Sequence, residues 1–466
     1  MKNIDLSYIQ KFASSVSLIL ILIIVSSQFG FSQSFNINRD SINRLTNSDY
    51  EEMKRQLGIL DTRPGPSGDP KNPNAANIDE SKVRAYTLPD PLMDKAGKPV
   101  KSTEEWWSFR RDEIVADLES EVYGKIPENL PEVKWMVLEE REVTIGPYAV
   151  KEKVLSGQVD NDTYPEIEVN IQMVVGTPIN IQNPVPVVLQ FGFIRSPFGG
   201  ESVESENYFM THYEPRWKEQ LLTQGWGYAI IVPGSIQADH GAGLKSGIIG
   251  LANKGKNRTP DQWGALRAWA WGASRAMDYF ETDKEVDAKR IAVEGTSRYG
   301  KAALVAMAFE PRISLGFIGS SGAGGASILR RNFGEQVENL ASSSEYHWFS
   351  GNFIKYASNL TADDLPVDAH SLISVCAPRG VFISAGSPHI EGQWIDAKGM
   401  FLAGVHASPV YELLNAKGLE SFTFPYMGAA LTDGEVAYRQ HAGGHTTGPN
   451  WSTWIGWASR YWNANE

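Results

Sequence analysis

The sequence predicts an α/β fold in which a mostly parallel sheet is wrapped by helices, after an N-terminal extension. Uniformly apolar runs at residues 185–191, 228–232 and 380–385 are typical of strands that helices cover on both faces. Between the last two runs, apolar residues from Trp263 to Phe280 recur at steps of three and four, which predicts one face of a packed helix. The chain has 466 residues, 42% of them hydrophobic and 21% charged, so it can bury a large core.

The first 32 residues resemble a secretory signal. Lys2 and Lys11 precede the apolar run 18–25, and small residues at 30–32 suit cleavage. A membrane anchor is the alternative, but the run is short for a bilayer. We expect residues 1–32 to be a signal peptide, and the mature protein to be secreted or periplasmic and free of the membrane.

The next segment, residues 33–100, is rich in Asn, Asp, Ser and Pro, which predicts extended or partly mobile chain laid on a domain. Ser102 and Glu105 then fit a capping box that opens a helix running to about Tyr123. Alternating residues between 133 and 177 predict strands that form the antiparallel start of the sheet.

Charge and cysteine content exclude several classes of partner. The formal net charge is −12 and the chain has no basic run, which argues against nucleic acid and anionic membranes. The single cysteine, Cys376, lies in an apolar stretch and is expected to be an inert buried thiol.

A serine flanked by glycines is the most informative motif. Ser297, in Gly295-Thr296-Ser297-Arg298-Tyr299-Gly300, follows the apolar run 290–293 and precedes the helix-prone run 302–309. A strand that turns sharply into a helix around a serine is the nucleophile elbow of α/β-hydrolases, although the second glycine stands one place later than usual. An ordinary Gly/Ser turn is the alternative. The context favours the elbow, so we expect residues 101–466 to form an α/β-hydrolase catalytic domain.

Two late histidines are candidates for the general base. His441 and His445 flank Gly443-Gly444, in a loop where a hydrolase of this order, Ser then acid then His, would hold its base. A metal site is the alternative, but the glycines oppose a helix that would align the two rings, and no Cys or carboxylate cluster completes the ligands. We expect no metal and no cofactor.

The order of several motifs identifies a resemblance. Over roughly residues 80–463 the chain resembles the glucuronoyl esterases of carbohydrate esterase family 15, and bacterial members in particular. That resemblance implies a secreted serine esterase that splits esters of 4-O-methyl-glucuronic acid, as in lignin–glucuronoxylan linkages, with Ser297 as nucleophile and His445 as base. The motifs that carry it are Gly295–Lys301, Ser321–Gly325, Tyr346–Phe349, Gln393-Trp394 and Gly444-His445.

The same resemblance implies roles for other side chains. Arg298 would donate to the oxyanion, and Lys301 would contact the sugar. Glu345 would bind the uronate hydroxyls, and Trp394 would pack against the sugar ring. Glu338, or alternatively Gln336, would add a polar contact. The competing interpretations are a surface arginine, a solvated lysine, a helix cap and a core tryptophan.

The acid departs from the family pattern. Fungal members have a glutamate directly before Ser-Gly-Ala-Gly-Gly, and that position here is Ser320. We expect Glu391, in the loop after the strand 380–385, to orient His445, with Asp396 in reserve. Either carboxylate could instead cap this loop.

Two other functions stay open at this point. One is an esterase for other carbohydrate or methyl esters, and the other is a catalytically weakened relative that only binds acidic xylan. The joint presence of Ser297, Arg298, Lys301 and His445 favours an enzyme, which we expect to be a monomer acting on glucuronoxylan or lignin–carbohydrate esters. The natural alcohol and the need for the 4-O-methyl group are left open.

Overall fold

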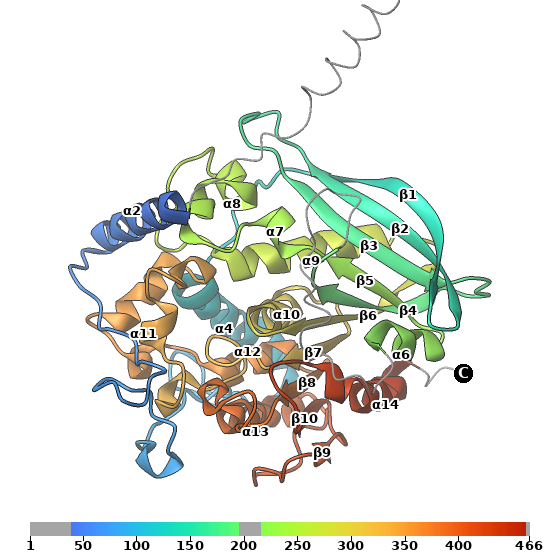
Figure 1. Ribbon diagram of the computed structural model, residues 1–466. Helices are drawn as coiled ribbons and strands as arrows, with labels where there is room; N and C mark the ends of the chain where they lie inside the picture. The colour runs from blue at the N-terminus through green and yellow to red at the C-terminus, as the bar shows by residue number, and fades with distance from the viewer. Residues whose placement is uncertain (1–38, 195–215, 463–466) are drawn as a thin grey trace, which may run out of the picture. The chain divides into compact units, whose positions relative to one another are not determined.

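Ten strands form a single sheet within the residues that the computed structural model describes, 39–194 and 216–462 (Figure 1). The sheet starts with three antiparallel strands, continues with six parallel ones, and ends with a short antiparallel edge strand. The predicted sheet, mostly parallel with an antiparallel start, is therefore confirmed. In spatial order the strands are β1 (Val133–Ile145), β2 (Tyr148–Val159), β3 (Asn170–Pro178), β5 (Gly227–Ile231), β4 (Val185–Phe191), β6 (Val286–Thr296), β7 (Leu315–Gly319), β8 (Gly380–Ala385), β10 (Val436–Gln440) and β9 (Ala430–Leu431).

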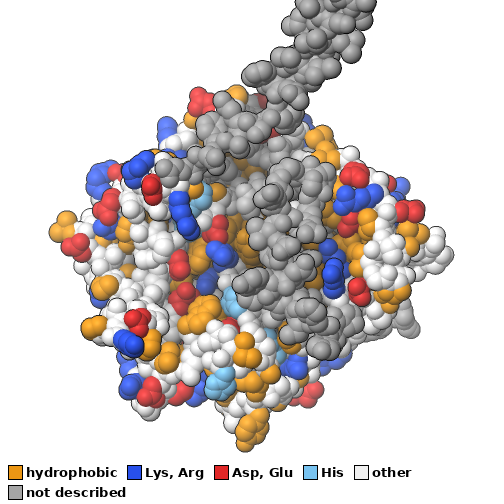
Figure 2. Space-filling model, viewed as in Figure 1, with side chains coloured by type: hydrophobic (Ala, Val, Ile, Leu, Met, Phe, Trp, Pro, Cys, Tyr) orange, Lys and Arg blue, Asp and Glu red, His pale blue; other side chains and the backbone are white. Residues whose placement is uncertain are grey.

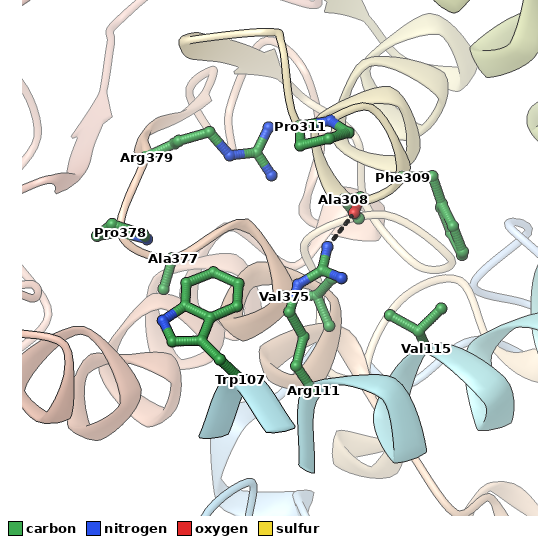
Figure 3. Close-up of a pocket in the computed structure, with 10 residues that line it drawn as sticks. All are labelled: Trp107, Arg111, Val115, Ala308, Phe309, Pro311, Val375, Ala377, Pro378 and Arg379. Atoms are coloured by element: carbon green, nitrogen blue, oxygen red, sulfur yellow. Dashed lines mark hydrogen bonds between the residues drawn. The ribbon is translucent and has the colours of Figure 1, made fainter. Parts of the chain in front are cut away.

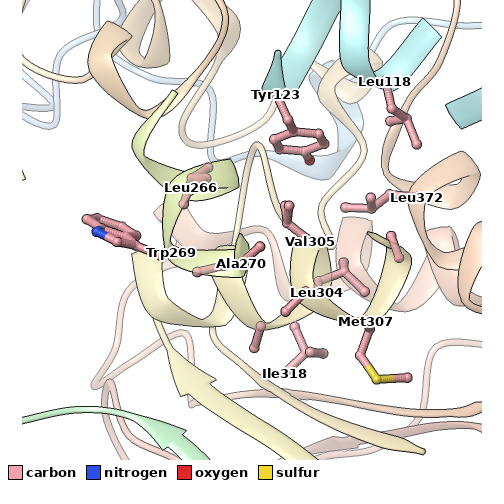
Figure 4. Close-up of a cluster of buried hydrophobic side chains, with 14 of the residues drawn as sticks. Leu118, Tyr123, Leu266, Trp269, Ala270, Leu304, Val305, Met307, Ile318 and Leu372 are labelled. Carbon is pink, nitrogen blue, oxygen red and sulfur yellow. The ribbon is translucent and has the colours of Figure 1, made fainter. Parts of the chain in front are cut away.

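Helices cover both faces of the sheet, which explains why its central strands are apolar at nearly every position. On one face lie α9 (Ala265–Phe280), α10 (Arg298–Phe309) and α12 (Ala369–Cys376), and Figure 4 shows Ala270 of α9 beside Leu304 of α10. On the other face lie α6 (Trp217–Thr223) and α14 (Trp451–Trp462), and Trp451 and Trp454 of α14 pack against Phe317 of β7.

Further helices, short apart from α13, occupy the connections. None of the described helices is both long enough and apolar enough to cross a bilayer. The predicted signal peptide, 1–32, lies outside the described residues. The remaining helices are η1 (Glu80–Lys82), α7 (Pro233–Ile236), η4 (Gly241–Lys245), α8 (Gly247–Ala252), η5 (Leu329–Arg331), α11 (Val337–Leu340), η6 (Tyr346–Trp348), η7 (Gly351–Ala357), η8 (Ala362–Asp364), η9 (Gln393–Ile395), α13 (Ala397–Leu413) and η10 (Gly448–Asn450).

The predicted capping box is confirmed. The amide of Glu105 donates to Ser102 Oγ at 3.1 Å, and the Glu105 carboxylate accepts from the Ser102 amide at 3.2 Å. The cap opens a run of consecutive helical turns that ends at Tyr123, as predicted. These turns are α3 (Thr103–Glu105), η2 (Trp106–Arg110), α4 (Arg111–Asp117) and η3 (Leu118–Tyr123).

The N-terminal segment corrects one expectation. Extended chain was expected throughout residues 33–100, but the structure places a 19-residue helix, α2 (Arg39–Leu57), within it. The helix was not predicted because most of its residues are polar and its apolar stripe is short. In that stripe Tyr50 and Met53, three residues apart, are buried. Beyond α2, the only helical element in the described chain up to residue 100 is the single turn η1, in line with the expectation.

Candidate active site

Ser297 joins β6 to α10 in a strained backbone conformation. Its φ of 62° and ψ of −131° lie where residues with a side chain are rare, and such strain is typical of functional turns. A Cβ at Gly295 would lie 2.2 Å from the Tyr299 carbonyl oxygen, so only glycine allows the chain to fold back this closely. The turn therefore presents the serine at the start of a helix.

The displaced second glycine meets a packing requirement. A Cβ at Gly300 would lie 2.5 Å from the carbonyl oxygen of Gly319 at the end of β7. At position 299, by contrast, the tyrosine ring packs edge-on against Trp269 with centroids 5.5 Å apart. In this chain the helix approaches the neighbouring strand at position 300, which explains the unusual spacing.

His445 and Glu391 are in direct contact. His445 Nδ1 lies 2.6 Å from Glu391 Oε1, and because a carboxylate only accepts, Nδ1 carries the shared proton. The Glu391 side chain is fully buried and its other oxygen accepts from the Gly386 amide, whereas the imidazole is 27% exposed. This contact directs Nε2 of His445 away from the acid, as a general base requires.

The reserve acid has other partners. Asp396 Oδ2 lies 2.9 Å from Arg331 Nε in a fully desolvated ion pair, and Asp396 Oδ1 accepts from the Gly399 amide at the start of α13. Burial raises the pKa of Asp396 and outweighs the opposing effect of Arg331. Ser320, at the position of the fungal glutamate, is completely buried and its hydroxyl has no partner within the described residues.

The histidine loop lies against the strand that carries the serine. The Ser297 amide donates to the Gly319 carbonyl at 2.9 Å. A Cβ at Gly319 would lie 2.2 Å from the methyl of Thr447, two residues after His445. The ends of β6 and β7 and the histidine loop therefore meet at one point. We call Ser297, Glu391 and His445 the catalytic edge, because all three follow the carboxyl ends of sheet strands.

Arg298 is held by an acid that the sequence analysis did not single out. Arg298 Nη1 lies 2.8 Å from Asp239 Oδ2, and Asp239 Oδ1 accepts from Trp348 Nε1 at 2.6 Å and pairs with His347 Nε2 at 3.0 Å. Burial raises the pKa of Asp239, but these hydrogen bonds and the charge of Arg298 outweigh it and lower the pKa overall. Asp239 is thus ionised and fixes the half-exposed guanidinium beside Ser297.

A buried lysine lies one turn beyond the serine. Lys301 is only 3% exposed, and its Nζ lies 3.2 Å from Glu335 and 5.5 Å from the centre of the Trp348 ring. Glu345 has an oxygen without a partner among the described residues. Burial, together with the nearby charge of Glu335, raises the pKa of Glu345 to about 7, against the effect of Lys301. We call Lys301, Glu335, Glu345 and Trp348 the sugar side.

The other expected sugar contacts divide into two groups. Trp394 is 38% exposed, and its ring centre lies 5.4 Å from that of His445, while its Nε1 donates to the Glu391 carbonyl. Glu338 instead pairs with Arg63 of the N-terminal segment at 2.8 Å. Gln336 caps α11. The structure therefore brings Trp394, but not Glu338, together with the catalytic edge.

No group of metal ligands exists among the described residues. His441 is buried, and its ring accepts from the Gly443 amide at Nδ1 and pairs with the Thr446 carbonyl at Nε2. Burial lowers the pKa of His441, so the ring is neutral and shapes the loop of His445. The two histidines thus have different partners.

Acidic, basic and histidine side chains lie side by side near the middle of the face in Figure 2. A separate cavity of about 350 Å³ opens at the far end of α10, where Arg111 donates to the Ala308 carbonyl (Figure 3). Ala308 is ten residues beyond the start of α10, about 15 Å along the helix. Arg379, which also lines the cavity, donates to carbonyls at this helix end, so both guanidinium groups act as caps.

Three polar residues of this region escaped the sequence analysis. Asp239 follows β5 by eight residues and Glu335 precedes the short helix α11, whereas Glu294 lies within β6 itself. A buried-strand position occupied by a carboxylate directly after the apolar run 291–293, as at Glu294, is the one signal that could have been noticed. The other two lie in irregular loops, where spacing gives no guide.

Comparisons with known proteins agree with this geometry. The family described as "Glucuronyl esterase, fungi" matches residues 258–415. The carbohydrate esterase MZ0003 of an unknown prokaryotic organism is 33% identical over 84% of this chain and 93% of its own length. The 4-O-methyl-glucuronoyl methylesterase of Schizophyllum commune is 28% identical over 70% of this chain and 73% of its own.

Solved structures extend the similarity to the whole architecture. A glucuronoyl esterase of carbohydrate esterase family 15 from Teredinibacter turnerae T7901 has a TM-score of 0.83 and 41% identity, covering 90% of this chain and 100% of that one. A glucuronoyl esterase from Solibacter usitatus has a TM-score of 0.71 and 35% identity, covering 82% and 100%. These similarities confirm the predicted α/β-hydrolase fold.

Proposed function

The chain belongs to carbohydrate esterase family 15, the glucuronoyl esterases, and from that membership we propose that Ser297, His445 and Glu391 carry out its reaction. The protein is a carboxylic ester hydrolase for glucuronoyl esters, as the sequence resemblance implied. The observation that supports the assignment best is the 2.6 Å contact of His445 with buried Glu391, in a loop packed against the strand that ends in a strained serine.

The chemistry follows the general scheme of serine hydrolases. Ser297 Oγ attacks the ester carbonyl carbon while His445 Nε2 takes its proton, and Glu391 stabilises the imidazolium that forms. The tetrahedral intermediate then breaks its bond to the alcohol oxygen, and the alcohol leaves with the proton from Nε2. A water molecule attacks the resulting acyl-enzyme with His445 again as base, which releases the uronic acid and restores Ser297.

The oxyanion forms at the positive end of α10. Unpaired amides of the first helical turn and the Arg298 guanidinium stabilise this charge, which exists only in the transition state and intermediate. Because Asp239 holds the guanidinium, little reorganisation is needed when the charge develops.

Lys301 and Glu345 would hydrogen-bond the sugar hydroxyls, and Trp394 would pack against the ring. For the further polar contact we now propose Glu335, which pairs with Lys301, rather than Glu338, which pairs with Arg63. The substrates would be esters of (4-O-methyl-)glucuronic acid on glucuronoxylan with lignin alcohols. We further propose that the enzyme is secreted or periplasmic and acts as a monomer without binding membranes.

A protein that only binds xylan is the second candidate, and it is disfavoured. The missing fungal glutamate at position 320 suggested it, but Glu391 contacts the base from the loop after β8. A buried carboxylate is costly unless it has a partner, and here the partner is the proposed base.

The test is hydrolysis of benzyl glucuronate by the wild type and by Ser297→Ala. The variant should retain its fold. Its kcat should fall until the rate is only ~10³-fold to 10⁴-fold above that of the uncatalysed reaction in water, which is the acceleration that binding and the oxyanion donors supply alone. An acetylated sugar is the control substrate. Turnover near the wild-type rate by Ser297→Ala, or preference for the acetylated sugar, would contradict the proposal.

A further inference from the structure

Glu294 is a buried carboxyl that the proposed reaction does not use. It lies in β6, three residues before Ser297, and is 1% exposed. Its Oε2 accepts from Gln190 Nε2 of β4 at 2.9 Å, and its Oε1 accepts from the Thr447 hydroxyl at 2.8 Å. Within the part of the chain that the structure describes, no cation pairs with Glu294.

The bond to Thr447 differs from the other contacts of the histidine loop. The Ser387 amide donates to the Gly443 carbonyl, the His441 amide donates to the Ala385 carbonyl, and His445 contacts Glu391. All of these contacts fix the loop to β8 or to the segment that follows it. Within the described residues, the bond from Thr447 to Glu294 is the only hydrogen bond between this loop and β6.

We infer that Glu294 is a positioning residue, which through Thr447 sets where His445 stands relative to Ser297. The nucleophile is three residues from one end of this bond and the base two residues from the other. Without the bond, the base would be aligned with its acid on the β8 side but not with the serine on β6. The inference rests on the proposed roles of Ser297 and His445.

The energetics favour a specific role over simple packing. A carboxyl without a cation is expensive to bury, and an apolar side chain would fill the same space at lower cost. Burial raises the pKa of Glu294 to about 7, although the hydrogen bonds from Gln190 and Thr447 oppose this. The described residues that pair with it are not ionisable: Gln190 on β4, Phe317 on β7 and Thr447 in the loop. Unfavourable buried groups of this kind cluster at functional sites.

The test uses paired substitutions at one position. Thr447→Val keeps the methyl that packs on Gly319 and removes only the hydroxyl, whereas Thr447→Ser keeps the hydroxyl. Thr446→Val is the matched control, since the Thr446 hydroxyl accepts from the Gly448 amide and does not contact β6. Glu294→Leu, which has no acceptor for the Thr447 hydroxyl, and the double variant with Thr447→Val complete a cycle, and Ser297→Ala is measured in the same series.

We expect Thr447→Val and Glu294→Leu each to lower kcat about tenfold with KM within twofold, because a small displacement of a base has large effects on rate. The double variant should be no slower than either single variant, and Thr447→Ser should restore kcat to within threefold. Reaction of Ser297 with phenylmethylsulfonyl fluoride, which needs no sugar contacts, should slow in the same proportion. Thr446→Val should react as the wild type.

Each other outcome overturns the inference. Wild-type kcat in Thr447→Val, fully additive effects in the double variant, a change confined to KM, or unchanged sulfonyl fluoride reactivity with a lowered Tm would show that Glu294 does not position the base. If Ser297→Ala stays active, the proposed function fails instead. If Ser297→Ala is inactive while Thr447→Val is normal, only this inference fails.

Discussion

The catalytic edge and the sugar side are held by different kinds of contact. The residues of the catalytic edge each lie within six residues of the end of a sheet strand, so the sheet itself fixes them. The sugar side depends on contacts from far along the chain. Tyr346, next to Glu345, donates to Asp49 Oδ2 of α2 at 2.7 Å, and Tyr50 donates to the Ala341 carbonyl at 2.9 Å.

More of the N-terminal segment supports the sugar side. Arg63 donates to Glu338 and to backbone carbonyls of Tyr356 and Leu360, and the Gly334 amide donates to the Asn77 carbonyl at 2.8 Å. The difference teaches that local strand geometry holds the proposed catalytic residues, whereas a segment almost 300 residues away in sequence holds the proposed sugar contacts.

The largest effect tests the catalytic edge. Glu391→Gln should lower kcat by about 10³ to 10⁴, because the amide favours the wrong tautomer of His445 and cannot stabilise the imidazolium. Asp396→Asn is the control: it weakens the buried pair with Arg331 and should lower Tm with little change in kcat. If Asp396→Asn were the slower variant, the acid would be misassigned.

The next effect concerns the link between the two regions, Arg298 with Asp239. Arg298→Ala should lower kcat about 10²-fold to 10³-fold through loss of an oxyanion donor. Asp239→Asn keeps the guanidinium but removes the charge that orients it, so kcat should fall about tenfold. Steady-state kinetics on benzyl glucuronate would distinguish them. If either variant changed KM alone, the proposal that Arg298 stabilises the transition state would be wrong.

A smaller effect sharpens the sugar side by pH. With a pKa of about 7, Glu345 is neutral at pH 6 and ionised at pH 8, and a carboxylate accepts hydrogen bonds from sugar hydroxyls more strongly. KM of the wild type should therefore fall about threefold over this range, whereas KM of Glu345→Gln should not change with pH. Because the native carboxyl binds its proton more tightly than the unfolded one, its contribution to stability is lost as pH rises towards 7. Equal pH profiles of KM would refute the role of Glu345.

The smallest effect tests the long-range support. Tyr346→Phe removes the hydrogen bond to Asp49 and should raise KM about twofold without lowering kcat, at a cost of about 1 kcal/mol in the free energy of unfolding. Tyr356→Phe loses a similar bond, to Glu121, and should lower stability equally with KM unchanged. If both variants behave alike in KM, the N-terminal segment has no special role in recognition.

This division explains what could be predicted from the sequence. Short stretches of consecutive residues determine the apolar strands, the capping box at Ser102 and the elbow at Ser297. The structure agrees with each of these predictions. Glu391 could be proposed because the catalytic acid of this fold usually lies in the loop after a particular strand, here the strand 380–385. The structure places Glu391 against His445. Predicting these features requires only the local sequence and the order of the strands along the chain.

The remaining features depend on contacts between residues that are far apart in the sequence. Asp239 and Glu335 lie in loops whose positions no periodicity reveals, and each meets its basic partner across a wide gap in sequence. Glu338 was an equally good candidate from sequence, since it lies three residues from Glu335, but Arg63 binds it. The stripe of α2 formed by Tyr50 and Met53 was too short to outweigh its polar composition.

The close contact between Gly300 and Gly319 bears on how relatives of this enzyme are found in genomes. What the fold demands is a residue without a side chain where the helix touches the neighbouring strand, and here that residue is the third after the nucleophile. A text search for Gly-x-Ser-x-Gly would pass over this chain, although its elbow is complete. Surveys of plant-polymer-degrading organisms that rely on that string would undercount enzymes in which, as at Tyr299, an aromatic ring has taken the usual place of the glycine.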